Sequence, residues 1–170
     1  MSARTHRRRR LAAGFTLIEV LVSLVILGIG VLGIAKLTLY SVRSNDSAYL
    51  RTQATMLAQS GLDYMRSNRL IAITGVYTTA LGAGPPAAAS CFFPNTCTPT
   101  ALATYDLNQW KTRLAAALPS GTGAITTAVV GDQVTATITV QWDDAVAQST
   151  INKAAAGVAQ PMQIVLETVL

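Results

Sequence analysis

The sequence has few charged residues and almost no histidine. Only 12% of its 170 residues are charged, whereas charged residues make up about a quarter of a typical soluble domain. This composition argues against an ordinary soluble globule. The single histidine, His6, and two cysteines leave too few ligands for a zinc site. We therefore expect no bound metal.

Catalytic motifs are also lacking. The sequence has no nucleophile elbow, no P-loop and no dinucleotide-binding fingerprint. Asp143 and Asp144 are adjacent, so in a strand they would point to opposite faces and could not act as a carboxylate pair. We expect no enzymatic activity and no cofactor, and we expect the chain to be a substrate of other enzymes instead.

The net charge of +5 lies at the N-terminus. It comes from Arg4 and from the four arginines at positions 7–10, and the other basic residues balance the 8 acidic ones. A nucleic-acid interface would instead spread basic residues, with aromatics between them, over a folded face. Nucleic acid is therefore not the first-choice partner, although an arginine arm that binds it stays open as an alternative.

A long apolar run follows the arginines. Residues 15–35 contain one charged residue, Glu19. A bilayer core of about 30 Å needs about 20 apolar residues, so the run predicts a membrane-spanning helix. The preceding arginines favour the cytoplasmic side, which sends the rest of the chain outward. Gly14 precedes the run, and no small-residue cleavage site follows it. A simple signal anchor would fit the hydropathy equally well.

Glu19 distinguishes this run from a plain anchor. A carboxylate inside an apolar segment is costly and implies a partner. A free α-amine at Phe15 would have a pKa of about 8. It could pair with Glu19 of the same chain or of a neighbour. This pairing requires cleavage between Gly14 and Phe15. An acidic residue that is merely tolerated at the membrane interface is the alternative.

The residues around Gly14 resemble the class III signal of type IV pilins and of type II secretion pseudopilins. The shared features are a short basic leader, Gly14, Phe15 as first mature residue and Glu19 at mature position five. The resemblance implies cleavage after Gly14 and N-methylation of Phe15 by a prepilin peptidase. It also implies that Glu19 guides subunit assembly by facing the Phe15 amine of a subunit already in the filament.

Three stretches within residues 8–69 look like the N-terminal half of PilV-type minor pilins. These are residues 28–33, 47–54 and 63–68, the last of the Asp-x-Met-Arg-x-Asn kind. The resemblance implies a type IV pilin-like fold of α+β class. In that fold a long N-terminal helix, membrane-spanning in its first half, packs on a small antiparallel sheet. Little of the loop at 75–90 is familiar, so a surface function there stays open.

The predicted organisation has three parts. Residues 1–14 form the leader, and residues 15–69 form one long helix, which is transmembrane over 15–35 and amphipathic over 36–69. Residues 70–170 form a periplasmic head domain. An apolar stripe at helical spacing marks the amphipathic half: Leu50, Ala54, Leu57, Gly61 and Met65. The polar cluster at 44–47 predicts a solvated face or a soft joint.

The head contains two cysteines, Cys91 and Cys97. They follow a membrane anchor on its exported side, where an oxidising compartment favours a disulfide. A thioredoxin-like centre would need C-x-x-C, which is absent. We therefore expect a structural disulfide between them.

A short helix and a sheet are expected after the cysteines. Residues 106–118 predict the helix, with Thr104 or Asp106 as N-cap, and Pro119 ends it. Its apolar face is formed by Leu107, Trp110, Leu114 and Leu118. Alternation over 134–142 predicts a half-buried strand, joined to 124–130 by a turn at Gly131 and Asp132. Residues 163–169 predict a third strand, whose buried face the pattern leaves undecided.

We expect a minor pilin that helps to prime and assemble the type IV pilus by packing its N-terminal helix in the inner membrane. The implied partners are the prepilin peptidase/N-methyltransferase, other minor and major pilins and the pilus assembly platform. The protein would cross the inner membrane once, with its head in the periplasm, and could enter the surface pilus. A minor pseudopilin of type II secretion is the alternative. A tip adhesin or DNA-binding subunit is a third hypothesis.

Overall fold

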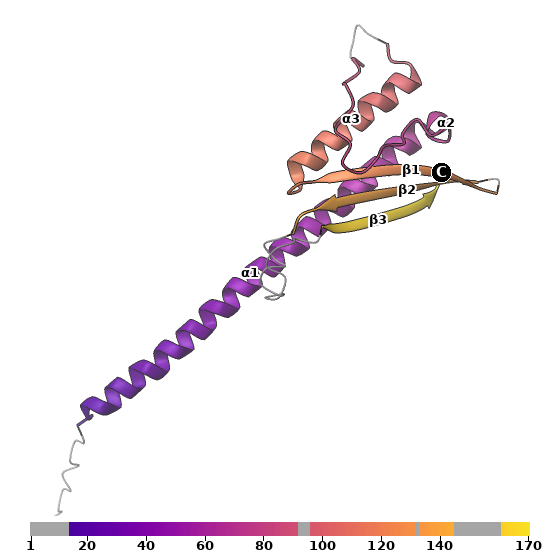
Figure 1. Cartoon of the computed structure of the whole chain (residues 1–170). Coiled ribbons are helices and arrows are strands. Elements are labelled where there is room, and N and C mark those ends of the chain that lie inside the picture. Colours follow the sequence, from indigo (N-terminus) through magenta and orange to yellow (C-terminus); the bar gives the residue numbers. More distant parts are fainter. Residues whose placement is uncertain (1–13, 92–95, 132, 145–160) are drawn as a thin grey trace, which may run out of the picture. The chain divides into compact units, whose positions relative to one another are not determined.

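The computed structural model describes residues 14–91, 96–131, 133–144 and 161–170. Its helices are α1 (Leu17–Ser67), α2 (Arg69–Ala72) and α3 (Pro99–Ala117), and its strands are β1 (Thr122–Val130), β2 (Gln133–Trp142) and β3 (Met162–Val169) (Figure 1). The chain divides into two compact units, Met1–Ser41 and Val42–Leu170, and α1 contributes to both. A long apolar helix together with a small antiparallel sheet confirms the predicted α+β fold class.

The strands form one antiparallel sheet, with β2 between β1 and β3 (Figure 1). Register places Ile138 of β2 opposite Ile125 of β1 and Leu166 of β3. Ile125 and Ile138 are buried, and Leu166 packs against the same core. The three predicted strands therefore exist, and each starts one or two residues before its predicted first residue. Gly131 has a positive φ of 62° at the turn between β1 and β2, whereas Asp132 lies outside the described residues.

The register also decides which face of β3 is buried. Ile164 and Leu166 pack against the core, while Val165 and Val169 are 54% and 48% exposed. Both faces of this strand contain apolar residues, so the sequence pattern alone could not choose between them.

The second half of α1 packs into the head through small side chains. Ala54, Ala58 and Gly61 are buried along with Met65. There is a specific reason for glycine at position 61, because a Cβ there would lie 3.0 Å from Nε1 of Trp110. That nitrogen donates a hydrogen bond of 2.8 Å to the Leu57 carbonyl. The apolar stripe predicted from the sequence thus faces the core.

Trp110 is held from the other side by a second glycine. A Cβ at Gly123, in β1, would come within 2.5 Å of the Trp110 ring. The indole is 1% exposed. The Trp110 indole of α3 therefore lies against the backbone of α1 and of β1. Larger residues at Gly61 or Gly123 would displace it from the core.

The polar cluster at 44–47 is not a break in the helix. α1 continues through it to Ser67. Ser47 Oγ donates a 2.5 Å hydrogen bond to a carboxylate oxygen of Asp144, which is 5% exposed just after β2. The cluster therefore ties α1 to the end of the sheet's central strand.

The start of α3 differs from the prediction. The helix begins at Pro99, and its N-cap is Thr98, whose side chain accepts a 3.2 Å hydrogen bond from the Ala101 amide. Neither Thr104 nor Asp106 is the cap, because both lie inside the helix. Threonine followed by proline is a typical N-cap and first-turn pair, so the signal was present in the sequence. The helix ends at Ala117, just before Pro119.

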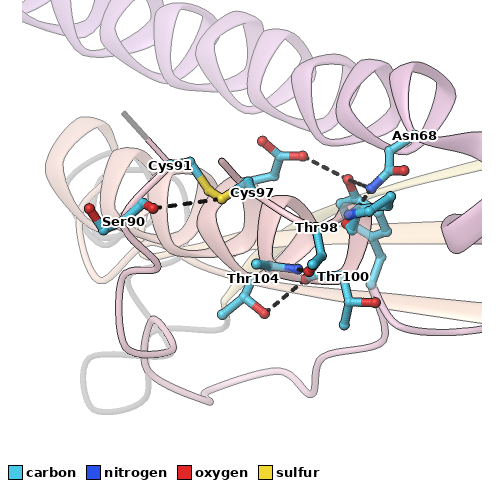
Figure 2. Close-up of a disulfide and its surroundings, with 11 residues drawn as sticks. Asn68, Ser90, Cys91, Cys97, Thr98, Thr100 and Thr104 are labelled. Atoms are coloured by element: carbon cyan, nitrogen blue, oxygen red, sulfur yellow. Dashed lines mark hydrogen bonds between the residues drawn. A yellow bond between two sulfur atoms is a disulfide. The ribbon is translucent and has the colours of Figure 1, made fainter. Parts of the chain in front are cut away.

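A disulfide joins Cys91 to Cys97, with Cα atoms 5.1 Å apart. Figure 2 shows that it lies directly before Thr98 and the first turn of α3. The Asn68 side chain donates a 2.7 Å hydrogen bond to the Pro99 carbonyl. Asn68 thus ties the N-terminus of α3 to the end of α1, and the disulfide closes the loop that precedes α3.

Lys111 holds the loop at 75–90, which precedes the disulfide. Its ammonium group donates to the carbonyls of Ala80 (2.9 Å) and Ala83 (2.8 Å). The lysine is only 4% exposed, and burial lowers its pKa. Asn108 adds a 2.6 Å hydrogen bond to the Pro86 carbonyl. α3 thus fixes a segment that has no regular secondary structure of its own.

A buried carboxylate bonds α3 to the segment after α2. The Tyr77 hydroxyl donates a 2.7 Å hydrogen bond to Asp106, and Asn68 donates a long 3.4 Å bond to the same hydroxyl. Burial raises the pKa of Asp106, and the bond from Tyr77 opposes this shift. The pKa of Tyr77 is also raised, first by burial and then by its bond to Asp106.

Replacing Asp106 with Asn should remove one source of pH-dependent stability. A carboxyl whose pKa is raised by folding stabilises the protein fully below its unfolded pKa and loses that contribution as the pH rises through the folded value. The free energy of unfolding of the wild type, relative to Asp106→Asn, should therefore increase as the pH falls from 7 to 4. Urea titrations of the full chain in detergent measure this difference.

The matched control is Asp63→Asn, which removes an exposed carboxylate that pairs with Arg66 at 3.8 Å. Its effect should be small, because exposed pairs contribute about 0–1 kcal/mol. A difference between wild type and Asp106→Asn that stays constant from pH 7 to pH 4 would contradict the expected role of Asp106.

Candidate processing and assembly site

The predicted cleavage point lies just before α1. Gly14, Phe15 and Thr16 are exposed and non-helical, and the helix starts at Leu17. Exposed segments outside regular structure are where proteolysis concentrates. The peptide bond between Gly14 and Phe15 is therefore accessible without unwinding the helix.

The fold itself gives no reason for glycine at position 14. A Cβ built on Gly14 would meet nothing within 4 Å. By contrast, Gly61 and Gly123 are required by the close approach of Trp110. If glycine is needed at position 14, the requirement comes from another molecule.

The apolar side chains of the first unit are exposed on all sides of α1. Phe15 is 82% exposed, Ile18 is 65% and Leu32 is 72%. An 18-residue window of this helix has a mean hydropathy of 2.7, and none of it is buried within the chain. A core helix of a soluble protein would be mostly buried. By length and composition, this helix could cross a membrane.

Two hydroxyl side chains in this part of α1 bond to the helix's own backbone. Ser23 Oγ donates to the Glu19 carbonyl at 2.7 Å, and Thr38 Oγ1 donates to the Ile34 carbonyl at 3.0 Å. Such bonds let hydroxyls sit in an apolar helix at little cost. They need no partner outside the chain.

Glu19 is different. It lies in the first turn of α1, where its amide donates to the Thr16 carbonyl at 3.1 Å. Its side chain is exposed, and within the described residues its carboxylate has no hydrogen bond or ion pair. A negative charge in the first turn is favourable for the helix dipole. That effect explains why the position tolerates a carboxylate, but it does not satisfy the carboxylate in an apolar environment.

Phe15 and Glu19 are not bonded to each other in this chain, in which Gly14 is still joined to Phe15. Cleavage after Gly14 would convert the Phe15 nitrogen from an amide into an amine, a hydrogen-bond donor with a positive charge at neutral pH. The paired disulfide cysteines belong to the second unit. The candidate processing and assembly site therefore comprises residues 14–19 and does not include the disulfide.

A family model of the prokaryotic N-terminal methylation motif matches residues 9–35. The chain has a prepilin-type N-terminus. This finding supports a type IV pilin-like or pseudopilin protein, anchored in the membrane by α1. The motif implies processing by a prepilin peptidase and assembly with other pilins. Comparison with curated proteins and with solved structures found no match.

Gly14→Leu should block processing. A side chain at the cut site would obstruct the peptidase, whereas the chain itself has room for it. We expect a precursor that keeps its arginine-rich leader, and mass spectrometry of the N-terminus measures this directly. The wild type should begin at a methylated Phe15.

Ala12→Leu is the matched control, because it adds the same side chain within the leader but away from the cut. It should be processed like the wild type. A mature-size product from Gly14→Leu would show that the cut lies elsewhere.

Proposed function

We propose that the protein is a minor pilin that helps to prime and assemble the type IV pilus by packing α1 against other pilin helices in the inner membrane. The observation that supports this most directly is the Glu19 carboxylate, which has no partner among the described residues and lies in the otherwise apolar, fully exposed first half of α1. Within the prepilin-type motif, that carboxylate needs a cationic partner. This partner would be the Phe15 amine that processing creates, either of the same chain or of a neighbouring subunit.

The proposed mechanism is charge pairing in a medium of low dielectric constant. The Phe15 amine of one subunit would face Glu19 of the next, and the pair would bring the two helices into the same axial register. Burial of both charges is costly unless they meet. The pairing therefore favours entry of a subunit only at the position where both charges are satisfied.

In the proposed orientation the head is periplasmic. The arginines of the leader would stay in the cytoplasm, and the Cys91–Cys97 disulfide fits an oxidising compartment. The protein is proposed to act by assembly, without a catalytic reaction of its own.

Resemblance at residues 28–33 and 63–68 favours a pilin over a pseudopilin. Deleting the gene and restoring it should distinguish the two. Loss of surface pili and twitching with normal protein export supports the minor pilin, and loss of export with normal pili supports the pseudopilin. Unchanged pili and unchanged export would overturn both.

Glu19→Ala should insert into the membrane normally and be processed, yet fail to enter filaments. Leaving one charge of a buried pair unmatched costs about 3–5 kcal/mol, which corresponds to more than about a 100-fold loss of incorporation. Quantitative immunoblots of sheared pili and of membranes measure the two pools.

Ser23→Ala is the matched control, since it lies one turn further along α1 and bonds only to the backbone. It should enter filaments normally. Normal incorporation of Glu19→Ala would remove the assembly role of this carboxylate.

A further inference from the structure

The two edges of the sheet are not alike. At the β1 edge, Ile125 and Thr79 exchange backbone hydrogen bonds of 2.9 and 3.0 Å. At the other edge, β3 pairs with β2 on one side only, and the described residues supply no strand to its outer side. Among the described residues, the β3 edge is therefore an open row of backbone groups.

The ladder identifies which groups are open. The Leu170 amide donates to the Val134 carbonyl at 2.9 Å, and bonded pairs recur at every second residue of an antiparallel ladder. Ile164, Leu166 and Thr168 therefore bond to β2. The amides and carbonyls of the alternate residues point away from β2: Gln163, Val165, Glu167 and Val169.

Nothing in β3 protects this edge. Edge strands usually avoid pairing by means of lysines, prolines or bulges. β3 contains neither lysine nor proline, and it pairs with β2 without a bulge. Its one charged residue is Glu167, and the β-branched Val165 and Val169 are half-exposed. The strand is well suited to accept another strand.

A groove lies along the same edge. It has a volume of about 340 Å³, and α1 and β3 both line it. Leu166, which is only partly buried, forms part of its wall. Its charged residues are Asp63, Arg66 and Glu167. Asp63 already pairs with Arg66, so Glu167 is left to attract a cation.

We propose that the β3 edge accepts an extended segment of another pilin-like subunit as a fourth strand. The main chain of that segment would bond to the open groups of β3, and alternate side chains would cover the groove. A lysine or arginine would face Glu167. β1, β2 and β3 contain no lysine or arginine. Pairing with one of these strands from a second copy would leave Glu167 without a cation, so the partner in this proposal is a different pilin-like subunit. This inference rests on the proposed assembly with other pilins.

Hydrogen exchange on the free full-length chain in detergent tests whether the edge is open. The amides of Val165 and Glu167 should exchange fast, and those of Ile164 and Leu166 should exchange slowly. Slow exchange at all four positions would mean that another part of the chain, such as residues 145–160, already covers the edge. The proposal would then be wrong.

Val165→Pro tests the edge in cells. Proline removes an amide that points away from β2, so no bond within the sheet is lost. We expect a folded protein with an intact disulfide, and incorporation into filaments that is lower by more than about tenfold, a change of about 1.4 kcal/mol. Val165→Thr, which keeps both the amide and the β-branched shape, should behave like the wild type. Normal incorporation of Val165→Pro would overturn the proposal.

Glu167→Lys is a second variant that keeps every backbone group, and it should also reduce incorporation. If the proline variant does not fold, this variant decides the outcome, and normal incorporation would again refute the inference.

Photo-crosslinking separates this inference from the proposed function. A benzoylphenylalanine placed at Gln163 should crosslink to an extended segment of another pilin-like subunit. The same probe at exposed Thr126 of β1 should not. If the wild type is absent from filaments, the proposed function fails, and this crosslink still decides whether the edge binds a neighbouring subunit. Absence of the Gln163 crosslink overturns the inference.

Discussion

One helix has to satisfy two different environments. In its first half, apolar side chains point outward on all sides and none of them is buried by the chain. In its second half, a narrow stripe of small and apolar residues is buried against the head. One helix can pass through both environments because its backbone groups bond to one another within the helix and need no outside partner. The rest of the structure depends on this continuity, since the core of the head is built on α1.

The head attaches to α1 partly through a large side chain that lies against glycine. Gly61 and Gly123 leave space for Trp110, and the indole then bonds to the carbonyl of Leu57. Tight packing of this kind specifies one arrangement, because an added methyl group has no free volume to enter. At the far end of α1, Asn68 bonds to the first residue of α3. The helix is therefore fixed to the head at several points along its second half.

Local sequence patterns predicted the helices and strands better than they predicted which distant residues contact one another. The alternation in 134–142 was enough to predict β2, because burial of one sheet face imposes a period of two. The stripe from Ala54 to Met65 likewise predicted which side of α1 is buried. Asp106 was misassigned as a cap because its true partner, Tyr77, lies 29 residues away. The Thr79 bridge to β1 was missed for the same reason, since no local pattern encodes a contact between distant residues.

The candidate site could be proposed from the sequence for the opposite reason. Met65 and Asn68 of the 63–68 stretch have clear places in the fold, one buried in the core and the other bonded to α3. Their presence therefore needs no external partner. Gly14 and Glu19 have no such place, because the glycine contacts nothing and the carboxylate is unpaired within the described residues. Residues that the fold does not need point to other molecules, and the ones proposed for these two residues are a peptidase and a neighbouring helix. For that reason the argument for function rests on residues 14–19 rather than on the head.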